Sequence, residues 1–89
     1  MLTLPAVVTH PLALNIARVL KVKVTSEAAG VVLDASALTQ FDSSALAVLL
    51  TCRRDALAAG KSFAVFGLPA KLGQLAGLYG VAKLIPSAV

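Results

Sequence analysis

The 89-residue sequence predicts a single α/β domain in which short strands and helices alternate. Two apolar runs, residues 31–34 and 62–66, have the length and residue types of strands that are covered on both faces. Longer segments with apolar residues at helical spacing stand before, between and after these runs. Because a helix then crosses from each strand to the next, the pattern favours parallel crossover connections.

The N-terminal segment, residues 2–8, is expected to form one short strand. Pro5 has no amide hydrogen to donate, so this strand should lie at a sheet edge or contain a bulge. Pro11 suits the first turn of a helix, and the apolar spacing continues that helix to about residue 22. Residues 25–30 are expected to form a loop.

The middle of the chain continues with a loop over residues 36–41 and a helix over residues 45–59. Gly60 ends this helix at the position where a left-handed backbone is favoured. After the strand at 62–66, Pro69 opens a third helix that extends to about residue 79.

The last segment, residues 81–86, is expected to add a short strand or coil after Gly80 ends the third helix. No repeat, linker or low-complexity tract divides the sequence. Residues 1–89 are therefore predicted to form one domain.

The composition excludes several classes of protein. The sequence is 58% hydrophobic and 13% charged, which is too apolar for a disordered chain. The apolar stretch 43–52 is too short to cross a membrane, which takes about 18 residues or more. The N-terminus has no basic region followed by a long apolar run, so no signal peptide is expected. These features predict a soluble cytoplasmic domain whose surplus apolar surface contacts a partner.

Catalytic and metal-binding chemistry is not expected. His10 is the only histidine and Cys52 the only cysteine, so a metal site and an internal disulfide are both excluded. No glycine-rich phosphate loop is present, and no cofactor is predicted. The net charge is +4, but the basic residues are scattered without interleaved aromatics, so nucleic-acid binding is not expected.

Asp34 and Asp42 form the one plausible pair of acids, because each follows a predicted strand or loop near one sheet edge. Such a pair of carboxylates could bind a cation or perform acid–base chemistry. The favoured interpretation is structural: Asp34 bonds loop amides and Asp42 caps a helix.

The sequence Asp42-Ser43-Ser44 stands where a loop passes into the helix at 45–59. All three residues are good caps, but open α/β sheets also place functional residues after the carboxyl ends of strands. The helix behind them has no polar face over its first two turns. Three of its residues are expected to remain uncovered and to contact a partner: Leu46, Leu50 and Leu57.

Ser43 is also a candidate phosphoacceptor. A phosphate would add roughly −1.5 to −2 charges at neutral pH, and the free amides of a helix N-terminus would accept it. Asp42 would repel that phosphate, and an apolar partner could not accommodate it. Phosphorylation is therefore expected to break docking without unfolding the domain.

Ordered landmarks in the sequence resemble the STAS family, which includes sulfate transporters and anti-sigma factor antagonists. The matching segments are VVLDASAL (31–38), FDSSALAVLL (41–50), Arg53-Arg54, AGK (59–61), GLP (67–69) and LAGLYGV (75–81). The resemblance implies a small mixed sheet of about four strands, with three helices packed mainly on one face. The family's N-terminal hairpin is trimmed here to residues 2–8, which exposes a sheet edge through which a homodimer could form.

Within the family, the LAGLYGV ending resembles MlaB-like subunits most closely. That resemblance implies a non-catalytic cytoplasmic subunit, peripheral to the inner membrane, that docks on the ATPase of a Mla-type phospholipid ABC transporter. Ser43 would be the contact residue, supported by Asp34, Asp42 and Ser44. The other implied partner-binding residues are Leu46, Leu50, Arg53, Arg54, Leu57, Leu78 and Tyr79.

The alternative branch implies an anti-sigma factor antagonist that a partner serine kinase phosphorylates on Ser43. A STAS domain that senses a small ligand or nucleotide is a third, less favoured reading.

Overall fold

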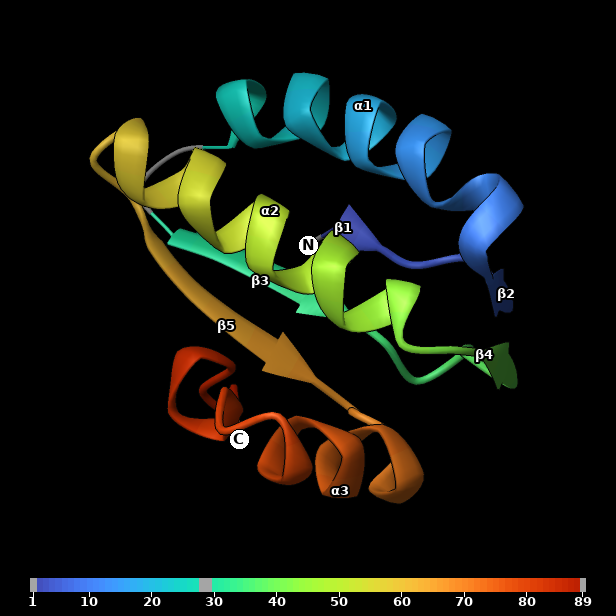
Figure 1. The fold of residues 1–89 in the computed structure, drawn as a ribbon. Coiled ribbons are helices and arrows are strands. Elements are labelled where there is room, and N and C mark those ends of the chain that lie inside the picture. The colour runs from blue at the N-terminus through green and yellow to red at the C-terminus, as the bar shows by residue number, and fades with distance from the viewer. Residues whose placement is uncertain (1, 28–29, 89) are drawn as a thin grey trace.

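A computed structural model describes residues 2–27 and 30–88. Figure 1 shows how the helices and strands follow one another. In chain order they are β1 (Leu2–Thr3), β2 (Val7–Val8), α1 (His10–Ser26), β3 (Gly30–Asp34), β4 (Gln40–Phe41), α2 (Ser44–Ala58), β5 (Ser62–Phe66), α3 (Ala70–Leu78) and the 3₁₀ helix η1 (Ala82–Leu84).

The strands form a three-stranded sheet in the order β1-β3-β5 and a separate two-stranded pair of β2 with β4. Every pair of these strands is parallel; Leu2 lies opposite Leu33, and Val31 lies opposite Phe63. The predicted α/β class is confirmed, but the expected mixed sheet is a parallel one in the part of the chain described. The reason is that α1 and α2 each return the chain to the start of the sheet before the next strand begins.

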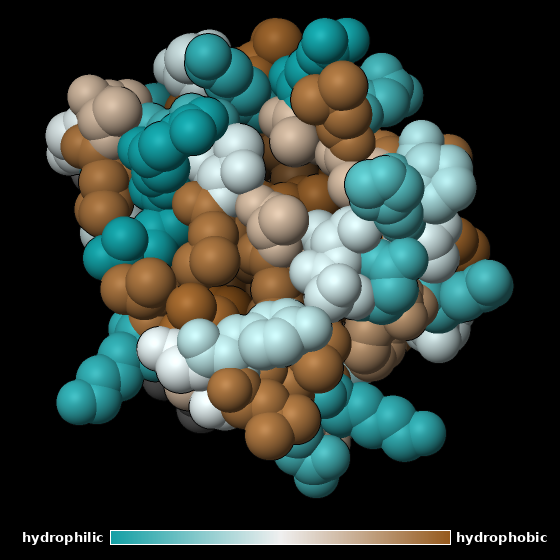
Figure 2. Space-filling model, in the orientation of Figure 1, coloured by the Kyte–Doolittle hydropathy of each residue, from teal (hydrophilic) through white to brown (hydrophobic). Residues whose placement is uncertain are grey.

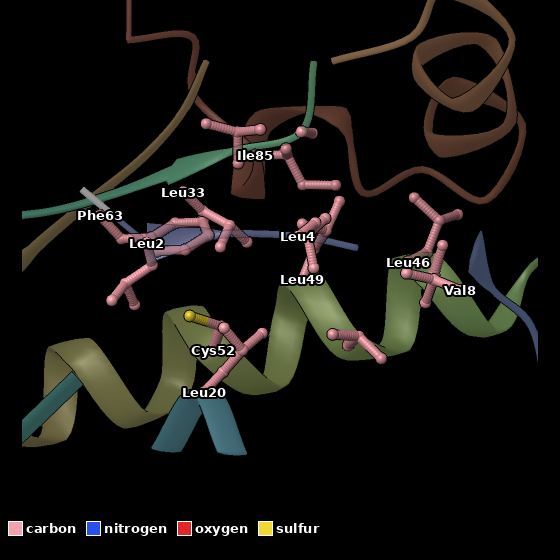
Figure 3. Packing of buried hydrophobic residues seen from close by; sticks show 14 of the residues in the cluster. Leu2, Leu4, Val8, Leu20, Leu33, Leu46, Leu49, Cys52, Phe63 and Ile85 are labelled. Atoms are coloured by element: carbon pink, nitrogen blue, oxygen red, sulfur yellow. The ribbon is translucent and has the colours of Figure 1, made fainter. Parts of the chain in front are cut away.

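The helices cover both sides of the sheet. Figures 1 and 3 show α2 and α1 on one side of the strands and α3 on the opposite side. Leu72 and Ala76 of α3 are fully buried in the core. The expectation that the helices pack mainly on one face holds for α1 and α2, while α3 covers the other face, because the apolar strands β3 and β5 need cover on both faces.

Proline divides the N-terminal strand as its missing amide hydrogen predicts. The strand expected over residues 2–8 is broken at Pro5 into β1 and β2. The Leu4 amide donates to the Asp34 carbonyl at 2.9 Å, and the Ala6 carbonyl accepts from the Gln40 amide at 3.0 Å. These bonds tie the segment to two different neighbours, and they place β4 inside the loop expected over residues 36–41.

The two edges of the larger sheet differ. At the β5 edge, the Val65 amide donates to the Pro86 carbonyl at 2.8 Å and the Ala88 amide to the Val65 carbonyl at 2.9 Å. The C-terminal segment, which passes through η1, therefore pairs with β5 at a single bridge between Val65 and Ser87. At the other edge lies β1, in agreement with the expected position of the N-terminal strand.

Helix α1 is longer than the sequence predicted, because its last turn is held by side chains. The Thr25 hydroxyl donates to the Val22 carbonyl at 2.7 Å. Lys61, just before β5, donates from its ammonium group to the carbonyls of Val24 at 2.6 Å and Thr25 at 3.2 Å, and also to that of Glu27. A cation at these carbonyls also suits the helix dipole.

Helix α2 packs against both α1 and β5, which explains its lack of a polar face. In Figure 3, Leu46 and Leu49 lie on the side of α2 that faces the strands, while Leu20 of α1 approaches Cys52. Burial, with a smaller contribution from Asp55, raises the pKa of the Cys52 thiol to about 11, as expected for an inert core residue. Of the described helices, none has the length and apolarity needed to cross a membrane.

Candidate functional site

The N-termini of α1 and α2 meet at the side chain of Asp42. The His10 amide at the start of α1 donates to Asp42 Oδ2 at 3.0 Å. The Ser44 amide at the start of α2 donates to Asp42 Oδ1 at 2.8 Å. Neither N-cap residue, Thr9 or Ser43, makes a capping bond with its own side chain. One carboxylate therefore caps both helices.

The electrostatics of this junction follow from the two helix dipoles. Both N-termini carry partial positive charge, and the negative carboxylate of Asp42 lies between them. The hydrogen bond from the His10 amide, followed by those from Ser44, lowers the pKa of Asp42 below its ordinary value of 3.8. The Ser44 hydroxyl lies 3.5 Å from His10 Nδ1 and adds a second, weaker link between the helices. Asp42 is therefore ionised at neutral pH.

Ser43 lies at this junction and is exposed to solvent. Its backbone is already helical, with φ −62° and ψ −19°, and its hydroxyl makes no capping bond. The sequence predicted Ser43 as one of three possible caps, but Asp42 fills that role. The Ser43 hydroxyl thus remains accessible at the start of α2.

Asp34 has a local role. Its Oδ1 accepts from the Ser36 amide at 2.8 Å and from the Ser36 hydroxyl at 2.6 Å. The bond from the Ser36 hydroxyl, then that from its amide, lowers the pKa of Asp34. Asp34 and Asp42 are each bonded within structural turns, and no cluster of three or more metal-ligating side chains occurs in residues 2–27 and 30–88. The favoured structural interpretation of the two acids agrees with these contacts.

The residues expected to bind a partner do not form one surface. Leu46 is only 3% exposed, so its prediction as an uncovered residue is wrong: it packs in the core beneath α2. Leu50 is partly buried against the same core, whereas Leu57 is 48% exposed. Leu78 and Tyr79 are exposed, but they lie at the end of α3 on the opposite side of the sheet.

The two arginines of α2 also differ. Arg53 is half-buried, while Arg54 is exposed and reaches Asp55 Oδ1 at 3.5 Å. The Arg54 side chain is 72% exposed, and an ion pair at 3.5 Å to so exposed a cation adds little stability, so Arg54 remains available to a partner.

A groove between α1 and α2 was not predicted from the sequence. Two adjoining hollows of about 180 and 190 Å³ form it and share Leu14, Ala17 and Thr51. Figure 2 shows hydrophobic residues, in brown, in the region between the two helices. The first hollow is completed by Ala13, Ala47 and Val48. The second is completed by Arg18, Lys21, Arg54 and Asp55. We call this surface the α1–α2 groove.

The sequence does carry a signal for the α1–α2 groove. Ala13 and Ala17 are four residues apart, as are Ala47 and Thr51, so each pair lies on one helix face. Small residues at this spacing leave room between two packed helices. A larger hollow of about 320 Å³ lies elsewhere, between β1 and another face of α1.

Comparison with known proteins identifies the family. The family model described as "Mlab, STAS domain" matches residues 2–86, which is nearly the whole chain. A search of curated proteins found no significant match. STAS domains are generally non-catalytic. The parallel sheet, its flanking helices and the Asp42-Ser43-Ser44 junction fit this match, and the chain therefore belongs to the MlaB-type STAS domain family.

Proposed function

We propose that this chain is a non-catalytic subunit that docks on the cytoplasmic ATPase of a Mla-type phospholipid ABC transporter and stabilises or regulates it. The observation that carries the proposal is that the Ser43 side chain is exposed and does not cap its helix. Its hydroxyl is exposed at the meeting point of two helix N-termini, and Asp42 has taken over the capping role. The membership of the chain in the MlaB-type STAS family supports this choice of partner.

The geometry suits a contact residue. A serine that does not cap its helix can donate its hydroxyl hydrogen to a partner and accept a bond in return. The rigid framework around Ser43, held by the bonds of Asp42 to His10 and Ser44, fixes where that hydroxyl lies. A preorganised contact of this kind lowers the entropic cost of docking.

The test is to purify an ABC ATPase subunit from the same genome with and without this chain and to measure ATP turnover. Ser43→Asp is expected to weaken binding at least about tenfold, because a buried contact would receive an unpaired charge. Gln74→Glu is the matched control: it adds the same charge on the exposed side of α3. An ATPase that is fully stable and active without this chain would contradict the docking function.

An anti-sigma factor antagonist is the second candidate, because the same exposed hydroxyl suits a phosphoacceptor. A phosphate on Ser43 would lie at the positive end of α2, where free amides favour an anion. Incubation with serine kinases of the antagonist-partner class and ATP would then label Ser43, and Ser43→Ala would abolish the label. Labelling together with failure to bind any ATPase would favour this candidate over the first.

A further inference from the structure

The α1–α2 groove begins at Ala13 and Ala47, one helical turn after Ser43, and follows both helices toward their C-terminal ends. The helices run in the same direction and start together at Asp42 (Figure 1). On α2, Ser43, Ala47 and Thr51 are spaced four residues apart and therefore lie along one face. The groove thus lies one helical turn from the exposed serine, on the same face of α2.

The floor of the groove is made by small side chains. Ala13, Ala17 and Ala47 extend only to Cβ, so the backbones of the two helices border a shallow channel. Each of its two hollows, at about 180 and 190 Å³, is smaller than a typical pocket for a small molecule, which is roughly 300–1,000 Å³. A channel of this shape fits a row of side chains from another helix, by the packing of ridges into grooves.

One rim of the groove carries an unpartnered apolar side chain. Leu14 borders both hollows and is 63% exposed. A leucine exposed beside an apolar channel gains from being covered, because its surface leaves water on docking.

The far end of the groove is basic. Arg18, Lys21 and Arg54 line it, and Arg18 and Lys21 form no ion pair among residues 2–27 and 30–88. The one acid present, Asp55, contacts Arg54 at 3.5 Å, so positive charge remains in excess. A partner surface with carboxylates at this end would be electrostatically complementary.

Asp55 supplies a further observation. Its side chain is 11% exposed, and its Oδ2 is buried without any hydrogen-bond partner. A buried carboxylate oxygen without a donor is unusual in folded proteins. Because this oxygen is closed to solvent, it is not itself part of the docking surface.

We propose that the α1–α2 groove receives an amphipathic helix of the docking partner, with small or apolar residues on the groove floor and carboxylates facing Arg18, Lys21 and Arg54. This inference rests on the proposed docking function and names the surface and the partner chemistry. It also places the acidic end of the partner helix remote from Ser43. A negative charge added at Ser43 would then oppose the apolar end of the partner helix.

The experiment measures the Kd of the full-length chain for the purified ATPase subunit by calorimetry. Leu14→Glu and Ala47→Arg are expected to raise Kd roughly tenfold or more, since each blocks the floor or rim with a charge. Val22→Glu is the matched control for Leu14→Glu, because Val22 is an exposed apolar residue of α1 that lines neither hollow. Leu78→Glu tests the alternative site at the end of α3. Circular dichroism and Tm values check that each variant folds.

A separate variant tests the basic end of the groove. Arg18→Glu with Lys21→Glu is expected to weaken binding roughly tenfold or more and to reduce the dependence of Kd on salt. Replacing an acidic residue of the partner helix with lysine should restore binding to this double variant. Lys71→Glu on α3 is the control for a change of charge alone.

The outcomes separate the groove from the docking function. If the unaltered chain binds the ATPase and the Leu14→Glu and Ala47→Arg variants bind it equally well, the groove proposal is overturned while the docking function stands. Loss of binding through Leu78→Glu alone would place the partner on α3 and overturn it as well. If Leu14→Glu converted a dimer to a monomer without changing ATPase binding, the occupant would be a second copy of the chain. Failure of the unaltered chain to bind the ATPase would overturn both proposals.

Discussion

Asp34 and Asp42 have the same local geometry and different partners. Each carboxylate accepts a hydrogen bond of 2.8 Å from the backbone amide two residues ahead, that of Ser36 or Ser44. Asp34 adds only the Ser36 hydroxyl at 2.6 Å. Asp42 adds the amide of His10, which is 32 residues away. The same turn is thus a local support at one site and a junction between two helices at the other.

The difference shows which part of the molecule the loss of each carboxylate charge would affect. At Asp34, the bonds hold a turn that packs against Gly67, on the connection after β5. At Asp42, the bonds hold the N-termini of α1 and α2, and thereby the positions of the two helices that border the α1–α2 groove. The first aspartate supports the fold, and the second also positions the candidate interface.

The largest loss of stability is expected from a substitution at Gly67, which packs against the Asp34 turn. Gly67 has φ +68°, and a Cβ at this position would lie 2.8 Å from the Cβ and 3.1 Å from the Cα of Ser36. Gly67→Ala should therefore lower the free energy of unfolding by about 2–4 kcal/mol, measured by urea titration. Gly60→Ala is the control, since Gly60 has φ +73° but open space around it, and should cost only about 1–2 kcal/mol. Equal losses would show that the Ser36 contact is unimportant.

The second prediction compares the two acids directly. Asp42→Ala should lower Tm more than Asp34→Ala, because it removes the caps of two long helices rather than the bonds of one turn. Thermal unfolding followed by circular dichroism measures both. Hydrogen exchange at the amides of His10 and Ser44 should accelerate in Asp42→Ala only. A larger loss of Tm in Asp34→Ala would contradict the role of Asp42 as the helix junction.

The third prediction concerns pH. Hydrogen bonds from His10 and Ser44 lower the folded pKa of Asp42 below 3.8, so ionised Asp42 stabilises the folded state. That stabilisation is present in full well above pH 3.8 and disappears as the pH falls through the lowered folded pKa. The difference in unfolding free energy between the unaltered chain and Asp42→Asn should therefore shrink between pH 7 and acid. A difference that stays constant over this range would exclude a lowered pKa.

The smallest effect is expected from Ser44→Ala. The Ser44 hydroxyl lies 3.5 Å from His10 Nδ1, at the limit of a hydrogen bond, whereas its amide carries the main contact with Asp42. The free energy of unfolding should change by less than about 0.5 kcal/mol in urea titration. Ser36→Ala, which removes the 2.6 Å bond to Asp34, should have the larger effect of the two. The reverse order would mean that Ser44 and His10 are strongly coupled.

Local signals in the sequence predicted much of the fold. The strands at 31–34 and 62–66 and the helix from 45 are confirmed, and Gly60 and Gly80 end their helices with positive φ as expected. These features depend on residues a few positions apart, which a sequence pattern reveals directly.

Features that depend on distant residues were predicted less well. The last turn of α1 depends on Lys61, and the junction at Asp42 depends on His10. Neither contact can be recognised from the residues nearby in the sequence, because its partners are far apart along the chain. Leu46 was placed on the wrong side because α2 is covered both by the sheet and by α1. The α1–α2 groove was missed for a related reason: small residues at helical spacing indicate close packing or an open channel equally well.

The contacts of Lys61 have a consequence for the chemical reactivity of the chain. Its ammonium group is held by the carbonyls of Val24, Thr25 and Glu27, whereas the other lysines, Lys21, Lys23, Lys71 and Lys83, are exposed. Acylating reagents attack a free, deprotonated amine, so they should modify those four first and Lys61 last. Acylation of Lys61 would then record how often the end of α1 separates from β5, and mass spectrometry could follow that opening in the intact complex.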